Sequence, residues 1–400
     1  DEPFKPYDFM RILRFFALPL VFMLGCQIET DYIKDLSFMK EHTEVLELSS
    51  PDLPNAKIMI IPAYQGRVMT STAGEKSYGW INYELIKSGE ILPHMNAFGG
   101  EERLWLSPEG GQFSIYFKPN DPFDFEHWQT PSAIDSEPFE LISVNESEAL
   151  FQKHIKLKNY SHTEFEIEIN RKVKALNKTE IAQILNSLNI NVLNTVAYQS
   201  ENKLTNLGED WQKETGTLGL WILGMYTPSD KTTLLAPFKP DTELALTNNY
   251  FGEIPADRLI HKDSILLFKG DGKYRSKIGI APWSAKPIAG AWDAHNQVLT
   301  IIKFDLKSKG DYLKSTWELH ENPYAGDAFN SYNDGPTDDG TQMGPFIELE
   351  SNSSSTALKR GESLIHKQST FHFEGDKLAL DKLAKELLGI SLGEIEESVK

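Results

Sequence analysis

The sequence predicts an all-β protein, mainly a sandwich of two large antiparallel sheets with small helical decorations. Apolar and polar residues alternate with a period of two in many segments after residue 55, which is typical of strands with one solvated face. Turn signals such as SPEGG, KPNDP, KGDGK and NDGP separate these segments. No repeat of fixed length and no Ser/Pro-rich linker divides the chain, so we expect residues 51–400 to form a single domain.

Two segments show the alternation most clearly. In TEFEIEINRKV, Phe165, Ile167 and Ile169 fall on one face and glutamates fall on the other, and QVLTIIKFDL repeats this pattern. Helical periodicity appears in Thr179–Leu188 and in Lys377–Leu388, a Leu-rich stretch that we expect to pack against a sheet edge. Further strands are predicted at Lys57–Pro62, Gly111–Phe117, Ser264–Lys269 and Phe346–Glu350.

The segment MRILRFFALPLVFMLGC ends at Cys26, the single cysteine of the sequence. Two arginines, a short apolar run and a small residue before the cysteine form the layout of a bacterial lipoprotein signal, and the run is too short to span a bilayer. We therefore predict a signal region at residues 1–26 and a tether at residues 27–50. Lipidation of Cys26 would anchor an exported protein to the outer membrane, on its periplasmic side or at the cell surface. The alternative is a buried apolar segment with an incidental thiol.

The composition and the absent motifs exclude several classes of function. A formal net charge of −18 disfavours nucleic acid as a partner, because nucleic acid binding rewards clustered Lys and Arg. An anionic ligand would need a local basic pocket in this acidic chain. The sequence contains no G-x-x-x-x-G-K-[ST], G-x-G-x-x-G, H-E-x-x-H or G-x-S-x-G pattern. We therefore expect no cofactor and no metal ion.

The first candidate site is the segment GGEERLWLSPEGG, residues 99–111. If this segment is extended, Glu101, Arg103 and Trp105 share one face, and the SPEG turn reverses the chain after them. An indole can cover the apolar face of a sugar, and charged groups can bind hydroxyls, a uronate or a sulfate. The alternative is an exposed ion pair beside a core tryptophan.

Two further clusters contain side chains suited to sugar chemistry. DPFDFEHWQTP contains His127, which can exchange a proton near neutral pH, next to Trp128. His94 is a further candidate, although a lone histidine is more often structural. In VAYQSENKLTNLGEDW, Tyr198 and Asn202 suit hydroxyl recognition, but asparagine is equally at home in turns.

The fourth cluster is NSYNDGPTDDGTQMGPFIELES. Tyr332, Asn333 and Asp334 are expected in a loop, and Glu348 and Glu350 on one face of the following strand. Two glutamates pointing the same way from an otherwise apolar strand suggest acid/base catalysis. The alternative is a solvent-facing strand.

The motifs FGGEERLWLSPEGGQFSIYF, DPFDFEHWQTP, TGTLGLWILGM, NSYNDGP and FIELES occur in this order. Together they resemble a family of bacterial lipoproteins of formerly unknown function with a galactose-mutarotase-like fold. The resemblance runs from about Ile58 to the C-terminus and includes the oligosaccharide dehydratases of marine bacterial ulvan utilisation. It implies a supersandwich of two large antiparallel sheets with a sugar site on its concave face.

The resemblance also implies roles for particular residues. Arg103 and Trp105 are similar to an arginine and a tryptophan that follow a Gly-containing turn in aldose epimerases of this fold. Their catalytic glutamate lies in a strand reading LET, which Leu349-Glu350-Ser351 resembles, with Glu348 on the same face. Their catalytic histidine has no counterpart in residues 202–206, which puts simple anomeric epimerisation in doubt. The acid is then sought among His94, His127, Tyr198 and Tyr332.

The leading hypothesis is a lyase or hydro-lyase acting on oligosaccharides from an acidic polysaccharide such as ulvan. Glu348, Glu350 or a histidine would be the base, Tyr332 or His127 the acid, and Arg103 the anion-binding group. The alternatives are an aldose 1-epimerase and a non-catalytic surface glycan-binding lipoprotein with Trp105, Trp128, Trp221 and Trp283 as stacking platforms. The residues expected to bind substrate are His94, Glu101, Trp105, Trp128, Tyr198, Asn202, Trp283, Asn333 and Asp334.

Overall fold

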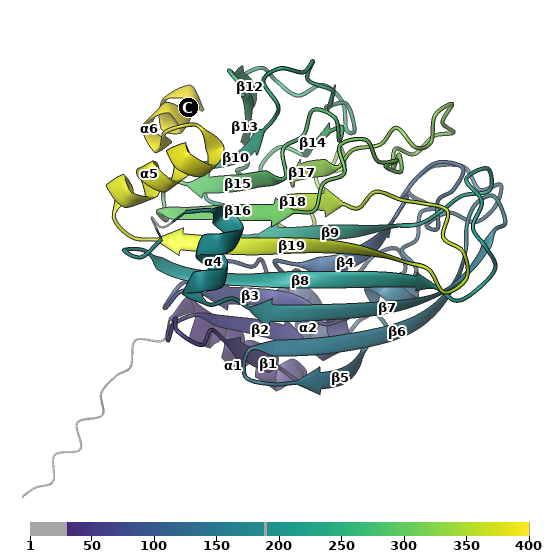
Figure 1. The fold of residues 1–400 in the computed structure, drawn as a ribbon, viewed down its shortest axis with the longest axis horizontal. Coiled ribbons are helices and arrows are strands. Elements are labelled where there is room, and N and C mark those ends of the chain that lie inside the picture. The colour runs from purple at the N-terminus through teal and green to yellow at the C-terminus, as the bar shows by residue number, and fades with distance from the viewer. Residues whose placement is uncertain (1–29, 188–189, 400) are drawn as a thin grey trace, which may run out of the picture.

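The computed structural model describes residues 30–187 and 190–399, and the predicted signal region with Cys26 lies outside these residues. A ten-stranded antiparallel sheet spans the molecule (Figure 1) in the order β12-β13-β10-β15-β16-β19-β8-β7-β6-β5. Its strands are β5 (Glu140–Val144), β6 (Glu148–Lys158), β7 (Glu164–Ala175), β8 (Asn194–Asn206), β10 (Thr232–Pro237), β12 (Leu259–Lys262), β13 (Ile265–Lys269), β15 (Ile288–Asp293), β16 (Val298–Phe304) and β19 (Ser363–Glu374).

A six-stranded antiparallel sheet packs on one face of the ten-stranded sheet, in the order β11-β14-β17-β18-β9-β4. Ile278, Ile347 and Leu349 on its inner face share a core with Phe268 and Ile302 of the larger sheet. Because side chains alternate along a strand, the residues between these apolar ones point away from the larger sheet. The strands are β4 (Arg103–Ser107), β9 (Gly219–Tyr226), β11 (Leu246–Thr247), β14 (Ser276–Ile280), β17 (Phe329–Asn333) and β18 (Ile347–Asn352).

A smaller N-terminal unit forms a third sheet with its own core. Tyr32, Met39, Met59 and Met69 are buried together there, and a bridge between Val68 and Glu102 joins this unit to the segment before β4. The predicted tether is therefore wrong for residues 31–49, which form a helix and a strand. The elements are α1 (Asp31–His42), β1 (Leu46–Ser49), β2 (Lys57–Ile61), the 3-10 helix η1 (Pro62–Tyr64), β3 (Arg67–Thr72) and α2 (Tyr83–Ser88).

Helices cover the outer face of the ten-stranded sheet. Leu380 and Leu383 of α5 pack on Phe371 and Phe373 of β19, so the helix predicted at Lys377–Leu388 is confirmed, but it lies on a sheet face rather than at an edge. The physical reason is its wide apolar stripe, which needs several strands to cover it. The remaining helices are α3 (Ser132–Asp135), α4 (Lys178–Leu185), α5 (Lys377–Leu388) and α6 (Leu392–Ser398).

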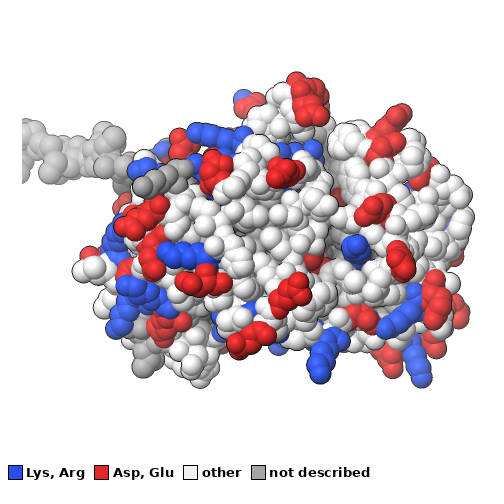
Figure 2. Space-filling view, turned by 90° about the horizontal axis from the view of Figure 1, so that it is seen from above, with Lys and Arg blue, Asp and Glu red and all other residues white. Residues whose placement is uncertain are grey.

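The alternating segments form β7 and β16, and the strands predicted near β2, β13 and β18 are confirmed. The strand predicted at Gly111–Phe117 is wrong, because this segment folds into turns. Gly111 has φ of +80°, and its carbonyl accepts from the Ser114 amide at 3.0 Å. No helix in the described part of the chain is both long and apolar enough to cross a membrane. Figure 2 shows acidic and basic side chains interspersed around a largely uncharged centre.

Candidate functional site

Charged and aromatic side chains gather on the outer face of the six-stranded sheet. The strand register places Trp105 opposite Trp221 and Tyr332 opposite Glu348, and Tyr332 is also opposite Lys277. Directly opposed residues on neighbouring strands point to the same face. We use the name outer-face site for this cluster, which comprises Arg103 and Trp105 of β4, Trp221 of β9, Lys277 of β14, Tyr332 of β17, and Glu348 and Glu350 of β18.

Glu350 lies at the centre of the outer-face site and is fully buried. Its Oε2 atom accepts from Lys277 Nζ at 3.0 Å and from the Trp221 indole Nε1–H at 2.9 Å. Its other oxygen, Oε1, is buried without a hydrogen-bond partner among the described residues. Burial lowers the pKa of Lys277, but Glu350 and Glu109 outweigh burial and raise it above its ordinary value. The lysine therefore remains a cation, and one carboxylate oxygen of Glu350 is left without a donor.

Glu348 points in the same direction from the same strand but has different neighbours. Arg103 Nη2 donates to its Oε1 atom at 2.9 Å, and both side chains are almost completely buried. The Arg103 guanidinium also lies 4.4 Å from the centre of the Trp105 ring. Burial raises the pKa of Glu348, Arg103 opposes this effect, and Glu350 adds to it. Glu348 therefore tends to keep a proton, although an arginine lies beside it.

Tyr332 and Asp334 form the end of the outer-face site nearest Glu348. The Tyr332 hydroxyl donates to Asp334 Oδ1 at 2.9 Å, and Asp334 Oδ2 accepts from the Gly344 amide at 3.0 Å. Burial and the nearby Asp334 carboxylate raise the pKa of Tyr332, against a hydrogen bond and a charge from Arg275. Burial likewise raises the pKa of Asp334. The Tyr332 hydroxyl thus stays protonated and acts as the donor to Asp334.

Partly exposed side chains from three loops border the outer-face site. Trp317 Nε1 donates to Glu109 Oε1 at 3.3 Å, and burial raises the pKa of Glu109. Tyr250 lies 5.6 Å from Lys277, measured from the ring centre to Nζ, and donates to Asp327 Oδ2 at 2.6 Å. These residues are only partly covered, whereas most members of the outer-face site are buried: Arg103, Trp105, Trp221, Tyr332, Glu348 and Glu350.

Three predicted substrate-binding residues lie elsewhere, between the two large sheets. Glu101 is fully buried, with its carboxylate 2.5 Å from His372 Nε2. Asn202 accepts from Arg171 at 2.9 Å, and Tyr198 donates to the Glu101 carbonyl at 3.5 Å. The prediction that Glu101 shares a face with Arg103 is wrong, because β4 begins only at Arg103. The segment before β4 passes through Gly99 and Gly100, whose φ angles of +98° and +105° break the alternation.

His127 lies in the surface turn that follows Phe123, and His94 lies in an earlier segment that contacts the end of this turn. His127 Nδ1 lies 2.6 Å from Asp124 Oδ1, and this hydrogen bond raises the pKa of His127. His94 Nδ1 lies 2.6 Å from the Trp128 carbonyl. Trp128 itself is buried and stacks on Trp317, with ring centres 5.7 Å apart. The structure brings none of these three predicted residues into contact with Glu348 or Glu350. Trp283 lies in a loop, 49 % exposed.

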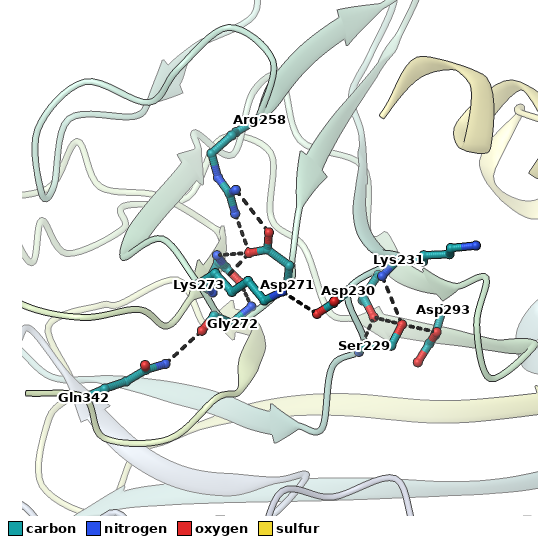
Figure 3. A network of polar contacts seen from close by, with 11 residues as sticks. Ser229, Asp230, Lys231, Arg258, Asp271, Gly272, Lys273, Asp293 and Gln342 are labelled. Carbon is teal, nitrogen blue, oxygen red and sulfur yellow. Dashed lines mark hydrogen bonds and ion pairs between the residues drawn. The ribbon is translucent and has the colours of Figure 1, made fainter. Parts of the chain in front are cut away.

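Asn333 stabilises the turn that leads into β14. Its Oδ1 atom accepts from the Gly272 amide at 2.8 Å, and its Nδ2 atom donates to the Tyr274 carbonyl at 2.9 Å. Figure 3 shows the surrounding network, in which Arg258 binds Asp271 and Gln342 donates to the Gly272 carbonyl. Lys273 in the same turn pairs with Asp230 at 2.7 Å (Figure 3). Asn333 therefore contacts the backbone of this turn rather than the outer-face site.

Several groups of the site were not predicted. Lys277 is the one charged residue in SKIGI, a strand that is otherwise apolar or small, and this was the signal that could have found it. Glu109 lies within SPEGG. We interpreted this segment only as a turn, so its carboxylate was not considered as part of a site. Arg275 and Trp317 have no local pattern that marks them. The described residues contain no group of three or more His, Cys, Asp or Glu side chains arranged to hold a metal ion.

Residues 30–399 match a sequence family described as "Family of unknown function (DUF6786)", and no curated protein sequence matches the chain. A putative aldose 1-epimerase from Escherichia coli is similar in structure, with a TM-score of 0.50 and 12 % identity over 82 % of this chain and 98 % of that chain.

Two further solved structures resemble the chain. A galactose mutarotase-like protein from Lactobacillus casei has a TM-score of 0.47 and 11 % identity, over 83 % of this chain and 99 % of that chain. A putative mutarotase from Salmonella typhimurium has a TM-score of 0.48 and 9 % identity, over 84 % of this chain and 92 % of that chain. The galactose-mutarotase-like fold predicted from the sequence is confirmed.

Proposed function

The chain belongs to the DUF6786 family of unknown function, and we propose that it is a hydro-lyase that removes water from oligosaccharides of an acidic polysaccharide such as ulvan. The observation that carries this proposal is the pair Glu348 and Glu350. They point the same way from one strand but have different surroundings. Glu348 lies beside an arginine, and burial raises the pKa of Glu348. Glu350 binds a lysine and an indole. Two carboxyl groups in unlike environments suit an acid and a base.

The proposed reaction is the elimination of water across two neighbouring sugar carbons. The unpartnered Oε1 atom of Glu350 removes a proton from the carbon next to the uronate carboxyl. The electron pair of that C–H bond forms the double bond, and the C–O bond to the neighbouring hydroxyl breaks. Protonated Glu348 supplies the proton with which the hydroxyl leaves as water. Lys277 and Arg103 stabilise the negative charge that develops on the substrate.

The aromatic residues of the outer-face site support a sugar as the substrate. Trp105 and Trp221 meet edge to face with ring centres 5.7 Å apart. The Trp105 indole Nε1 is buried without a hydrogen-bond partner among the described residues. An indole can donate its one N–H group to a sugar hydroxyl. A ligand hydroxyl or a water molecule would satisfy this N–H group.

The experiment is to incubate the purified protein with oligosaccharides prepared from ulvan. Absorbance of the unsaturated sugar and mass spectrometry would follow the reaction, and a product lighter by one water is expected. Glu350→Gln should abolish this product, whereas Glu164→Gln on the exposed face of β7 should leave it unchanged. Cleavage with unsaturation but no water loss would show a glycan lyase. Anomeric exchange at constant mass would show an aldose 1-epimerase, and binding without any change would show a glycan-binding protein.

We also propose, from the sequence alone, that the protein is exported and carries lipid on Cys26. The basic residues, apolar run and cysteine of residues 10–26 support this proposal. Fractionation of cells that express the chain, compared with Cys26→Ser, would test it. The proposal requires wild-type protein in the outer-membrane fraction, and an equal distribution of both proteins would contradict it.

A further inference from the structure

We propose that Arg275 binds the carboxylate of the acidic sugar and so determines the substrate class of the outer-face site. The inference rests on the proposed function, because it assumes that an oligosaccharide lies across Glu348 and Glu350. Four lines of observation support it: the pairing of the other cations, the position of Arg275, the rigidity of its backbone, and an unsatisfied hydrogen-bond donor.

The other cations of the site already contact acidic side chains of the protein. Lys277 is bound to Glu350 at 3.0 Å and Arg103 to Glu348 at 2.9 Å. Arg275 has no carboxylate within ion-pair distance among the described residues, and its Nε atom is buried without a hydrogen-bond partner there. A guanidinium that is partly exposed and not ion-paired can form the two parallel hydrogen bonds that a carboxylate accepts.

The position of Arg275 suits a sugar that reaches Glu348. Arg275 directly precedes β14 and lies two residues before Lys277, a separation of about 7 Å along an extended chain. It also lies close enough to the Tyr332 side chain to lower the pKa of that hydroxyl, and Tyr332 is the strand partner of Glu348. A uronate held by Arg275 would therefore place its ring carbons over Tyr332 and Glu348, where the proposed chemistry takes place.

The backbone that carries Arg275 is held firmly in place. The turn before it is fixed by Asn333, which accepts from the Gly272 amide, and by Asp271, which accepts from the Lys273 amide and is labelled in Figure 3. On the other side Gly335 packs so closely that a Cβ atom there would lie 2.3 Å from the Arg275 amide nitrogen. The guanidinium is 4.0 Å from the centre of the Phe251 ring, which limits its rotation. Such preorganisation favours a binding role, because little freedom is lost when the anion arrives.

The test is calorimetric binding in the Glu350→Gln background, which prevents turnover. The ligands are acidic ulvan oligosaccharides, the same oligosaccharides after reduction of their carboxyl groups to alcohols, and the same oligosaccharides after desulfation. Adding Arg275→Met should weaken binding of the acidic and desulfated ligands about 10- to 100-fold. It should leave the Kd of the carboxyl-reduced ligand unchanged. Lys273→Met in the same turn is the matched control and should change none of these values.

Three outcomes would overturn the assignment. Equal weakening of all ligands would make Arg275 a structural residue that orders Phe251. Weakening that disappears on desulfation would mean that Arg275 binds a sulfate, and no weakening would place the carboxylate elsewhere. Arg275→Lys keeps the charge and should weaken binding less than methionine does, which keeps the proposal testable if Arg275→Met fails to fold. Failure of the proposed function would be separate: wild-type protein would release no water, whatever Arg275 binds.

Discussion

Glu350 is the proposed base, and its two carboxylate oxygens have different surroundings. One accepts from Lys277 and Trp221, and the other has no partner among the described residues. Glu350→Gln keeps the size and an acceptor for the indole but cannot take a proton. We expect kcat to fall about 10²- to 10⁴-fold, with the Kd for substrate changed far less. Steady-state kinetics and calorimetry would check this, and a kcat within threefold of wild type would exclude Glu350 as the base.

Arg103 is both a catalytic candidate and a structural residue, because its ion pair with Glu348 is buried. Arg103→Ala leaves Glu348 without its counter-charge, and removing one partner of a buried pair costs about 3–5 kcal/mol of unfolding free energy. Protonation of Glu348 would reduce this cost, so the loss should be larger near pH 8 than near pH 5. Urea unfolding at both pH values would measure it. Lys34→Ala, which removes an exposed pair, should cost less than about 1 kcal/mol.

Asp327 beside Tyr250 makes stability depend on pH. Burial raises the pKa of Asp327 to about 6, whereas an unfolded aspartate has a pKa of about 3.9. Its contribution to stability is therefore complete below about pH 4 and is lost as the pH rises through about 6. Asp327→Asn cannot ionise, so relative to wild type it should gain up to about 3 kcal/mol between those pH values. Urea unfolding across this range would measure the gain.

Asp339 supplies a control of opposite sign. Hydrogen bonds from Thr337 and Thr341 lower the pKa of Asp339 to about 2. The contribution of this group to stability is therefore present above the pKa of an unfolded aspartate and lost as the pH falls through about 2. Asp339→Asn should lose stability relative to wild type as the pH rises. The same sign for both variants would contradict this account.

At the scale of elements, substitutions in helix α5 should change the stability of the fold without changing activity. Leu383 is fully buried against the outer face of the ten-stranded sheet, and Leu378 on the same helix is 79 % exposed. Leu383→Ala should cost about 2–5 kcal/mol of unfolding free energy, with no change in kcat, because the outer-face site lies on the other sheet. Leu378→Ala should change neither quantity. Thermal melting and kinetics would test both, and a fall in kcat for folded Leu383→Ala would show coupling between the two sheets.

Single strands could be predicted from the sequence wherever one face is buried. The alternation in FIELES correctly placed Glu348 and Glu350 on one face of β18, and the alternation in RLWLS did the same for Arg103 and Trp105. The prediction failed at Glu101, where two glycines with positive φ end the extended geometry. Alternation is a local property, and it ends where the backbone leaves the β region.

At the scale of the whole molecule, the net charge of −18 repels the acidic substrate that the site is proposed to bind. Raising the ionic strength from about 10 mM to about 150 mM shortens the screening length from about 30 Å to about 8 Å. We therefore expect kcat/KM on acidic ulvan oligosaccharides to rise with salt. Oligosaccharides that are both carboxyl-reduced and desulfated carry no charge, so salt should leave their Kd unchanged. A fall in kcat/KM would show that attraction by local cations outweighs the long-range repulsion.

The composition of the site could not be read from the sequence, because it depends on which strands become neighbours. Lys277 reaches Glu350 only because β14, β17 and β18 lie side by side. Arg103 reaches Glu348 only because β9 lies between β4 and β18. No local pattern specifies these pairings between segments far apart in the chain. Four clusters were predicted, and the structure combines parts of the first and the fourth.

The same strand order has a consequence for biosynthesis. β9 contributes Trp221 between β4 and β18, and β18 lies near the C-terminal end of the sequence. Glu348 and Glu350 are thus among the last groups of the site to leave the ribosome. β4, on the far side of β9, is synthesised long before them. A prematurely terminated chain that lacks β18 would keep the arginine and tryptophans but neither proposed proton carrier. Activity should therefore be all or none with respect to completion of the chain.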